Sequence, residues 1–387
     1  PNIDKFANKS IQFNNFFVSP VCAPTRSSLM TGRYSLRTGV RDTYNGGAIM
    51  SNNETTIAEI LKEANYATGI FGKWHLGDNY PFRPSEQGFD ESLIHLAGGI
   101  GQVGDFTNYY KGNTSYFDPI LWKNNKQNQY EGYCSDIFAE NAIEFIEKNK
   151  NNSFFCYLSF NAPHTPLQVP EKYYNMYKDL DPELGFKGES LALKMSKKDK
   201  EDARRIYGMV TNIDDNFGKV LNKLTELGIE EDTIIIFMTD NGPQQFRYNS
   251  NMKGLKGTVY NGGTRVPFYI KYAGKFKNSK VINRMSAHID VLPTILELCN
   301  LNVPNDRKID GQSLVSLINS KTFNDRYLFS YWTRRFPEKY INMSIQNDNY
   351  KLVGNNDFDS KIEEFELYDL VEDPNENNNT ISKNIEL

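Results

Sequence analysis

Residues 204–242 read RRIYGMVTNIDDNFGKVLNKLTELGIEEDTIIIFMTDNG, and this stretch carries the clearest information about the fold. Residues 204–227 show an apolar stripe at helical spacing, formed by Ile206, Val210, Ile213, Phe217, Val220 and Leu224. Gly228 follows where a helix-terminating glycine is expected. The apolar run 233–238 then indicates a buried strand. A helix leading directly into a buried strand favours an α/β fold with a largely parallel sheet.

The same order of elements occurs earlier in the chain. The spacing of apolar residues predicts a helix over residues 56–65 and a strand over 66–71. Ser135 is a plausible N-cap for a second helix, which leads into a strand over 154–160. Residues 173–202 are rich in Lys and Asp, which predicts a surface loop or an irregular helix.

From about residue 326 the pattern changes to short alternating runs, which predict an antiparallel sheet. We therefore expect two domains. Residues 1–322 form a large domain whose central, mostly parallel mixed sheet is flanked by helices. Residues 323–387 form a small domain with an antiparallel sheet.

Composition excludes several classes of protein. Hydrophobic residues make up 39% of the 387 residues and charged residues 24%, as in globular proteins. The net charge of −4 and the lack of a basic stripe argue against a nucleic-acid partner. No apolar run approaches the roughly 20 residues that span a bilayer. Four cysteines permit two disulfides, but no CxxC pair occurs, and the four histidines lie too far apart in sequence to suggest zinc.

Polar clusters follow three of the apolar strands. Lys73 and His75 follow the first, His164 follows the second, and Asp240 and Asn241 follow the third. In open α/β sheets, ligands bind beyond the carboxyl ends of the strands. The mixture of cations, imidazoles and oxygen ligands suits an anionic substrate and a metal such as calcium. Taken alone, a histidine after a strand is usually a locally bonded loop residue, and Asp-Asn-Gly is often only a turn; the coincidence of three such strand ends favours a site.

The segment CAPTR, residues 22–26, is followed by TGR at residues 31–33. Pro24 can open a helix, so Cys22 is expected just before a helix N-terminus, an end that favours anions. These residues resemble the signature of formylglycine-dependent sulfatases of the alkaline phosphatase superfamily. The resemblance continues along the chain in FGKWHLG (71–77), GFD (88–90), NAPHTP (161–166), KGT (256–258) with GGTRVP (262–267), and LYDL (367–370) with DP (373–374).

Two departures from the family pattern stand out. Position 261 is Asn where the family usually has Glu, and this difference is expected to alter local packing. The family also has a first strand ending in two aspartates, which we expect to precede Pro1 in the full protein. Without it, the resemblance leaves Cys22, Asp240 and Asn241 as metal ligands.

The resemblance implies an alkaline phosphatase-like fold and a mechanism. A separate formylglycine-generating enzyme would oxidise Cys22 to an aldehyde, whose hydrate attacks sulfur beside one calcium ion. His164 or Lys256 would protonate the leaving alcohol, and His75 would accept a proton when sulfate is released. Arg26 and Lys73 would hold negative charge nearby.

The resemblance favours a sulfated carbohydrate as substrate and a periplasmic or secreted location. Candidate sugar-binding residues are Asp105, Trp332, Arg334 and Arg335, although an ordinary strand and surface role for the last three fits equally well. The G-x-G-x-x-G match within residues 98–104 does not follow a clear strand, which argues against a dinucleotide site. Two alternatives stay open: a phosphodiesterase or phosphonate hydrolase of the same superfamily, or a non-catalytic carbohydrate-binding relative.

Overall fold

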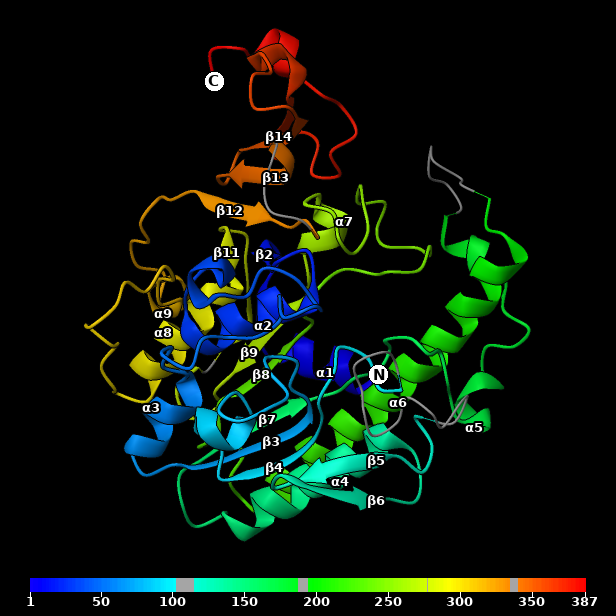
Figure 1. Ribbon diagram of the computed structural model, residues 1–387, viewed down its shortest axis with the longest axis vertical. Helices are drawn as coiled ribbons and strands as arrows, with labels where there is room; N and C mark the ends of the chain where they lie inside the picture. Colours follow the sequence, from blue (N-terminus) through cyan, green and yellow to red (C-terminus); the bar gives the residue numbers. More distant parts are fainter. Residues whose placement is uncertain (102–114, 187–193, 277, 335–339) are drawn as a thin grey trace.

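The computed structural model describes residues 1–101, 115–186, 194–276, 278–334 and 340–387 (Figure 1). The α-helices of this part are α1 (Asn2–Asn8), α2 (Cys22–Thr31), α3 (Ile57–Glu63), α4 (Cys134–Lys148), α5 (Glu171–Tyr174), α6 (Lys197–Glu226), α7 (Asn261–Thr264), α8 (Val291–Leu298) and α9 (Val315–Ile318). The strands are β1 (Ile11–Phe13), β2 (Phe16–Phe17), β3 (Ala67–Lys73), β4 (Glu91–His95), β5 (Ile120–Lys123), β6 (Lys126–Gln129), β7 (Phe154–Ser159), β8 (Ile235–Met238), β9 (Phe268–Lys271), β10 (Lys280–Ile282), β11 (Ser286–Ala287), β12 (Leu328–Tyr331), β13 (Tyr340–Gln346), β14 (Tyr350–Asn356) and β15 (Glu366–Asp369). This arrangement confirms the α/β class.

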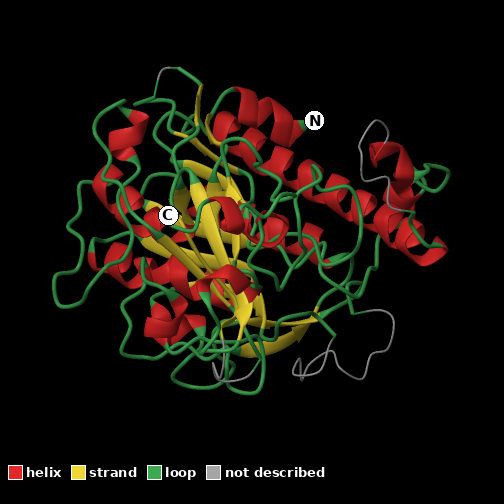
Figure 2. Cartoon of the chain, turned by 90° about the horizontal axis from the view of Figure 1, so that it is seen from above, coloured by secondary structure: helices red, strands yellow, loops and turns green. Residues whose placement is uncertain are grey.

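Two mixed sheets form the large body. One has the order β6-β5-β4-β3-β7, with β3 parallel to both β4 and β7, and with β5 and β6 antiparallel to their neighbours. The other has the order β10-β1-β9-β8, in which β1 and β10 are parallel and β9 is antiparallel to β1 and β8. Seen from above, helices lie on both sides of the strands (Figure 2).

Each face of the β3 sheet packs against its own set of helices. Ile70 belongs to an apolar cluster with Met30 of α2 and Leu61 of α3. The next residue, Phe71, belongs to a second cluster with Phe145 of α4 and others from α6. Successive strand residues point to opposite faces, so this alternation places α2 and α3 on one face and α4 and α6 on the other.

A cavity of about 1270 Å³ separates the two sheets. Within the described residues, β7 pairs only with β3 and β8 only with β9, so neither facing edge carries a partner strand. Apolar side chains such as Phe155, Ile236 and Phe217 line this cavity. Strand residues expected to be buried on both faces are consequently only half-buried here.

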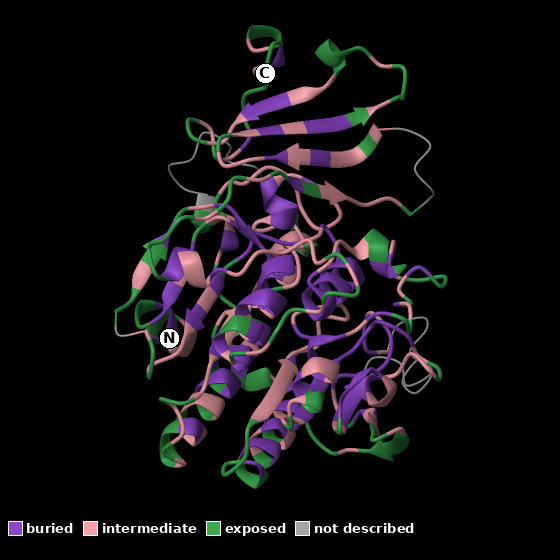
Figure 3. Cartoon of the chain, turned by 90° about the vertical axis from the view of Figure 1, so that its left-hand side faces the viewer, coloured by how far each residue is buried: buried purple, intermediate pink, exposed green. Residues whose placement is uncertain are grey.

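The C-terminal sheet is antiparallel throughout, with the order β12-β13-β14-β15. It lies above the large body in Figure 1, and its strands alternate buried with partly exposed residues in Figure 3. The prediction of a small C-terminal antiparallel sheet is confirmed. Across the described ranges, no helix is long and apolar enough to cross a membrane.

Three local predictions were wrong. Helix α6 begins at Lys197, because Ser196 and Asp199 form a capping box, so residues 197–202 are helical. Helix α4 begins at Cys134 with Tyr133 at the N-cap, rather than after Ser135. Cys22 is the first residue of α2 and Pro24 its third. Proline is tolerated anywhere in the first turn, because the N–H groups there have no partner within the helix, so Pro24 does not mark the helix start.

Candidate active site

Arg26 joins four separate elements at one point. Its Nε and Nη2 atoms donate to Oδ2 of Asp240 at 3.0 and 2.8 Å. Its Nη1 atom donates to the carbonyl oxygen of Lys73 at 2.9 Å and to the hydroxyl of Ser159 at 2.5 Å. Arg26 lies one helical turn after Cys22 on α2. The buried guanidinium therefore holds the ends of β3, β7 and β8 around the start of this helix.

His75 contacts Cys22 directly. Its Nδ1 atom lies 3.4 Å from the sulfur, and its Nε2 atom lies 2.7 Å from the carbonyl oxygen of Thr43. A carbonyl oxygen can only accept, so Nε2 carries a proton. In the neutral ring, Nδ1 therefore faces Cys22 with a lone pair that can accept a proton from a group at position 22.

The surroundings of Cys22 are strongly cationic. Burial raises the pKa of this thiol, but Lys73, Lys256 and His75 outweigh burial and bring the pKa well below its ordinary value. Burial alone raises the pKa of Cys156 to about 12. All four cysteines are free, so neither of the permitted disulfides forms. Cys22 differs from the other cysteines in lying where an anion is stabilised.

Lys73 is a fully buried cation at the end of β3. Burial, together with Arg26 and Lys256, lowers its pKa to about 8 against the opposing effects of Cys22 and Asp240. The ammonium is charged below about pH 8 and neutral above it. An anion bound beside Cys22 therefore loses the electrostatic stabilisation that the charged Lys73 ammonium provides as the pH rises.

We expect kcat/KM for an anionic ester to fall about tenfold per pH unit as the pH rises above 8, since one proton is lost. A pH–rate profile measures this decline directly. Lys73→Arg keeps a permanent cation, so its profile is expected to stay flat over the same range. An unchanged decline in this variant would assign the titration to another group.

His164 lies in the same charged cluster after β7. Burial lowers its pKa to about 2, with Lys73 and Lys256 adding to the effect. Its Nδ1 atom lies 2.8 Å from the carbonyl oxygen of Thr165, so Nδ1 carries the proton and Nε2 is an acceptor. In the free protein His164 is therefore neutral.

Asp240 and Asn241 offer oxygen atoms for a metal ion. The side-chain oxygen of Asn241 is buried and has no hydrogen-bond partner in the described structure, while its Nδ2 donates to the carbonyl of Gly242 at 2.8 Å. Arg26 contacts only Oδ2 of Asp240 and holds the pKa of this carboxyl well below its usual range against the effect of burial. Calcium takes six to eight oxygens. No group of three or more His, Cys, Asp or Glu side chains in the described ranges could hold a metal, so a calcium ion beside Asp240 and Asn241 would need further oxygen ligands.

Two of the predicted substrate-binding residues lie at the edge of this cluster. The indole Nε1 of Trp332 donates to Oδ1 of Asp42 at 3.2 Å, and the exposed guanidinium of Arg334 lies over the rings of Tyr44 and Trp332, 4.7 and 5.2 Å from their centroids. Asp42 precedes Thr43, the partner of His75. The other two predicted residues, 105 and 335, lie outside the described residues.

Sequence reasoning missed some residues of this cluster. Ser159 contacts Arg26 and donates to the carbonyl of Lys73 at 2.9 Å. His95 ends β4 in register with Lys73, and burial together with Lys73 and Arg26 lowers its pKa. The sequence held two signals for these residues. One is a polar residue inside the apolar run 154–160, and the other is a histidine at the end of a strand beside Lys73. Thr43 left no signal, because it contributes only its backbone carbonyl.

These features together define a hydrolase with the α/β fold of the alkaline phosphatase-like superfamily and an anion site at the carboxyl ends of its strands. A sequence model of the sulfatases matches residues 1–301, and one described as the C-terminal part of N-sulphoglucosamine sulphohydrolase matches residues 255–386. The chain belongs to the sulfatase family.

Named relatives and solved structures agree with this assignment. The ulvan-active sulfatase of Formosa agariphila is 29% identical over 403 residues, covering 99% of this chain and 72% of the relative. The N-acetylgalactosamine-6-sulfatase of Mus musculus is 29% identical, covering 86% of this chain and 64% of that enzyme. The crystal structure of Ps i-CgsB in complex with k-i-k-neocarrahexaose has a TM-score of 0.81 at 27% identity, covering 100% of this chain and 84% of the other.

Proposed function

We propose that this sulfatase removes sulfate from a sulfated carbohydrate, and that it uses Cys22 in its formylglycine form. The observation that carries the proposal is the position of Cys22 at the start of α2, in contact with His75 and within the field of Lys73 and Lys256. The names of the relatives support a carbohydrate, since they include an ulvan-active sulfatase and an N-acetylglucosamine-6-O-sulfatase.

Formylglycine at position 22 would supply, as its hydrate, an oxygen nucleophile for sulfur and a second hydroxyl that lets sulfate leave. The side chains of this chain provide the rest. Lys73 and Lys256 hold the negative charge of the sulfate group in a buried site, where electrostatic stabilisation is strong. Lys256 donates a proton to the leaving alcohol, and Nδ1 of His75 accepts one from position 22.

We propose that Asp240 and Asn241 hold one calcium ion together with the oxygen at position 22. Calcium would add fixed positive charge beside the sulfate group. The cavity between β7 and β8 reaches Lys73, His164, Asp240, Asn241 and Lys256. One more β-strand would fit in this cavity between the edges of β7 and β8, as the family resemblance leads us to expect. Such a strand would pair with both free edges and end beside Asp240, where its side chains could complete the oxygen ligands.

We also propose that Trp332 and Arg334 bind the sugar next to the sulfate group. Arg334→Ala is expected to raise KM for a sulfated oligosaccharide about tenfold and to leave kcat for a small aryl sulfate unchanged. The guanidinium is 52% exposed and its ion pair with Asp42 is 3.7 Å long, so little stability is lost. Arg284→Ala is the control, because it removes an arginine whose side chain is 42% exposed and which also pairs with an aspartate. A KM unchanged for every oligosaccharide tested would remove Arg334 from the binding site.

Assays with matched esters test the proposed function. Wild-type enzyme from a host with a formylglycine-generating enzyme should hydrolyse sulfate esters, and phosphate diesters and phosphonates much more slowly. A preference for phosphorus esters would favour the phosphonate hydrolase alternative, whose known representative from Agrobacterium radiobacter shares the fold at a TM-score of 0.70 and 18% identity. We further propose a periplasmic or secreted location, where sulfated polysaccharides are encountered.

A further inference from the structure

A buried ion pair outside the Cys22 cluster has no role in the mechanism given above. Lys351 of β14 and Glu376 are both 0% exposed, and Nζ of Lys351 lies 2.8 Å from Oε1 of Glu376. Taking two opposite charges out of water is costly, and an apolar pair of similar size is often at least as stable. The pair therefore calls for a reason other than stability.

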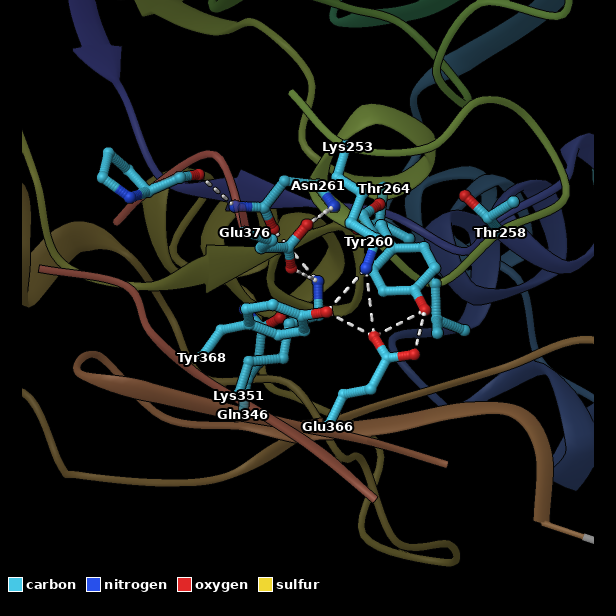
Figure 4. Close-up of polar contacts among 12 residues, drawn as sticks. Lys253, Thr258, Tyr260, Asn261, Thr264, Gln346, Lys351, Glu366, Tyr368 and Glu376 are labelled. Carbon is cyan, nitrogen blue, oxygen red and sulfur yellow. Dashed lines mark hydrogen bonds and ion pairs between the residues drawn. The ribbon is translucent and has the colours of Figure 1, made fainter. Parts of the chain in front are cut away.

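Both members of the ion pair contact Asn261, the first residue of α7 (Figure 4). Oε2 of Glu376 accepts from the backbone N–H of Asn261 at 2.6 Å, and Nζ of Lys351 donates to the side-chain oxygen of Asn261 at 3.0 Å. The Nδ2 atom of Asn261 donates to the carbonyl of Pro374 at 2.9 Å. We call Lys351, Glu376 and Asn261 the clamp. It fixes the start of α7 to the C-terminal segment through three contacts.

Helix α7 in turn contacts the loop that carries Lys256. The N–H of Gly262 donates to the carbonyl of Lys253 at 2.7 Å. A Cβ atom added to Gly263 would lie 2.2 Å from the carbonyl oxygen of Thr258, so the two backbones touch directly. Any displacement of α7 is therefore passed to residues 253–258 without a flexible side chain to absorb it.

The same loop is bonded to both ends of the catalytic cluster. The N–H of Lys256 donates to the carbonyl of Pro243, two residues after Asn241, at 2.8 Å. The N–H of Gly257 donates to the carbonyl of Pro20, two residues before Cys22, also at 2.8 Å. Lys256 thus lies in a short bridge between α7 and the two segments that present Cys22 and Asn241.

We propose that the clamp is a positioning device: the C-terminal segment uses the buried Lys351–Glu376 pair to hold α7, and through α7 it sets the place of Lys256 beside Cys22. The inference rests on the proposed role of Lys256. Glu376, Lys351 and Asn261 do not touch the anion site themselves, so they act through Lys256. Nearer the surface, Nζ of Lys253 donates to the hydroxyl of Tyr368 at 2.6 Å and supports the same loop.

Amide hydrogen exchange of the folded protein tests the clamp without any substrate. In Asn261→Ala the ion pair and the bond from the backbone N–H of residue 261 to Glu376 stay intact, so this variant should fold, but the two side-chain bonds to Lys351 and to the carbonyl of Pro374 are lost. In Glu376→Gln the charge is lost and Lys351 is left unpaired. We expect the amides of Lys256 and Gly257 to exchange at least about tenfold faster in both variants, with little change in β3. Asp290→Asn is the matched control, because Asp290 is a buried carboxylate paired with Arg326 away from this loop.

Unchanged exchange at Lys256 and Gly257 in folded Asn261→Ala would overturn the proposal, as would an equal effect of Asp290→Asn. Kinetics provide a second readout. Asn261→Ala should lower kcat about tenfold in the wild-type background and have no further effect in the Lys256→Ala background. Exchange could change as expected although even wild-type protein hydrolyses no sulfate ester. The proposed function would then be wrong, but the conclusion that the clamp positions the segment of Lys256 would remain supported.

Discussion

Cys22→Ala is expected to hydrolyse sulfate esters at least about 1,000-fold more slowly than wild-type enzyme, because the nucleophile is lost with the side chain. The fold should survive, since the side chain is small and its hydrogen bond within the described residues is the contact with His75. We expect a loss of about 1 kcal/mol in the free energy of unfolding. Steady-state kinetics and a denaturant titration measure the two quantities separately.

Cys134→Ala is the matched control for this substitution. Cys134 is fully buried, and burial raises the pKa of its thiol, so it shares the burial of Cys22 without its cationic surroundings. This variant should lose similar stability and keep its activity within about threefold. Substantial turnover by folded Cys22→Ala protein would be incompatible with a nucleophile at position 22.

His75→Ala is expected to lower kcat by about 10² to 10⁴, the range over which a positioned general base contributes. The hydrogen bond to Thr43 fixes the proton on Nε2 and leaves Nδ1 free to accept from position 22. The step that becomes slower should be the release of sulfate from position 22. A rapid-mixing experiment should therefore show alcohol released in the first turnover, followed by a slow steady state.

His288→Ala serves as the control for the histidine substitution. His288 is buried, its Nδ1 lies 3.1 Å from the carbonyl of Phe17, and burial lowers its pKa to about 4. It has no recorded contact with Cys22 within the described residues. Its removal should cost stability and change kcat by less than about threefold. If alcohol release in the first turnover of His75→Ala is slowed as much as sulfate release, so that no burst of alcohol is seen, the base role assigned to His75 is wrong.

Much of the fold could be predicted because burial imposes a periodic pattern. The apolar stripe ending at Leu224 and the run 233–238 predicted the end of α6 and β8 correctly. The start of α6 escaped prediction because residues 197–202 are polar and exposed enough to show no stripe. The division of the chain after residue 322 stays a prediction.

The part of the candidate site that follows strands could be predicted, because ligands bind beyond the carboxyl ends of the strands in open α/β sheets. Lys73, His164 and Asp240 follow strands, and their placement at one end of the sheets follows from the α/β topology. The contribution of Thr43 comes from its backbone and leaves no trace in the residue type. The clamp was unpredictable for another reason: Lys351 and Glu376 come from segments that meet only in the folded chain.

Mass spectrometry of the peptide that contains residue 22 tests the central claim most directly. Enzyme purified from its native host and shown to hydrolyse a sulfate ester should carry an aldehyde at position 22 instead of a thiol. An intact cysteine thiol in fully active enzyme would contradict the account.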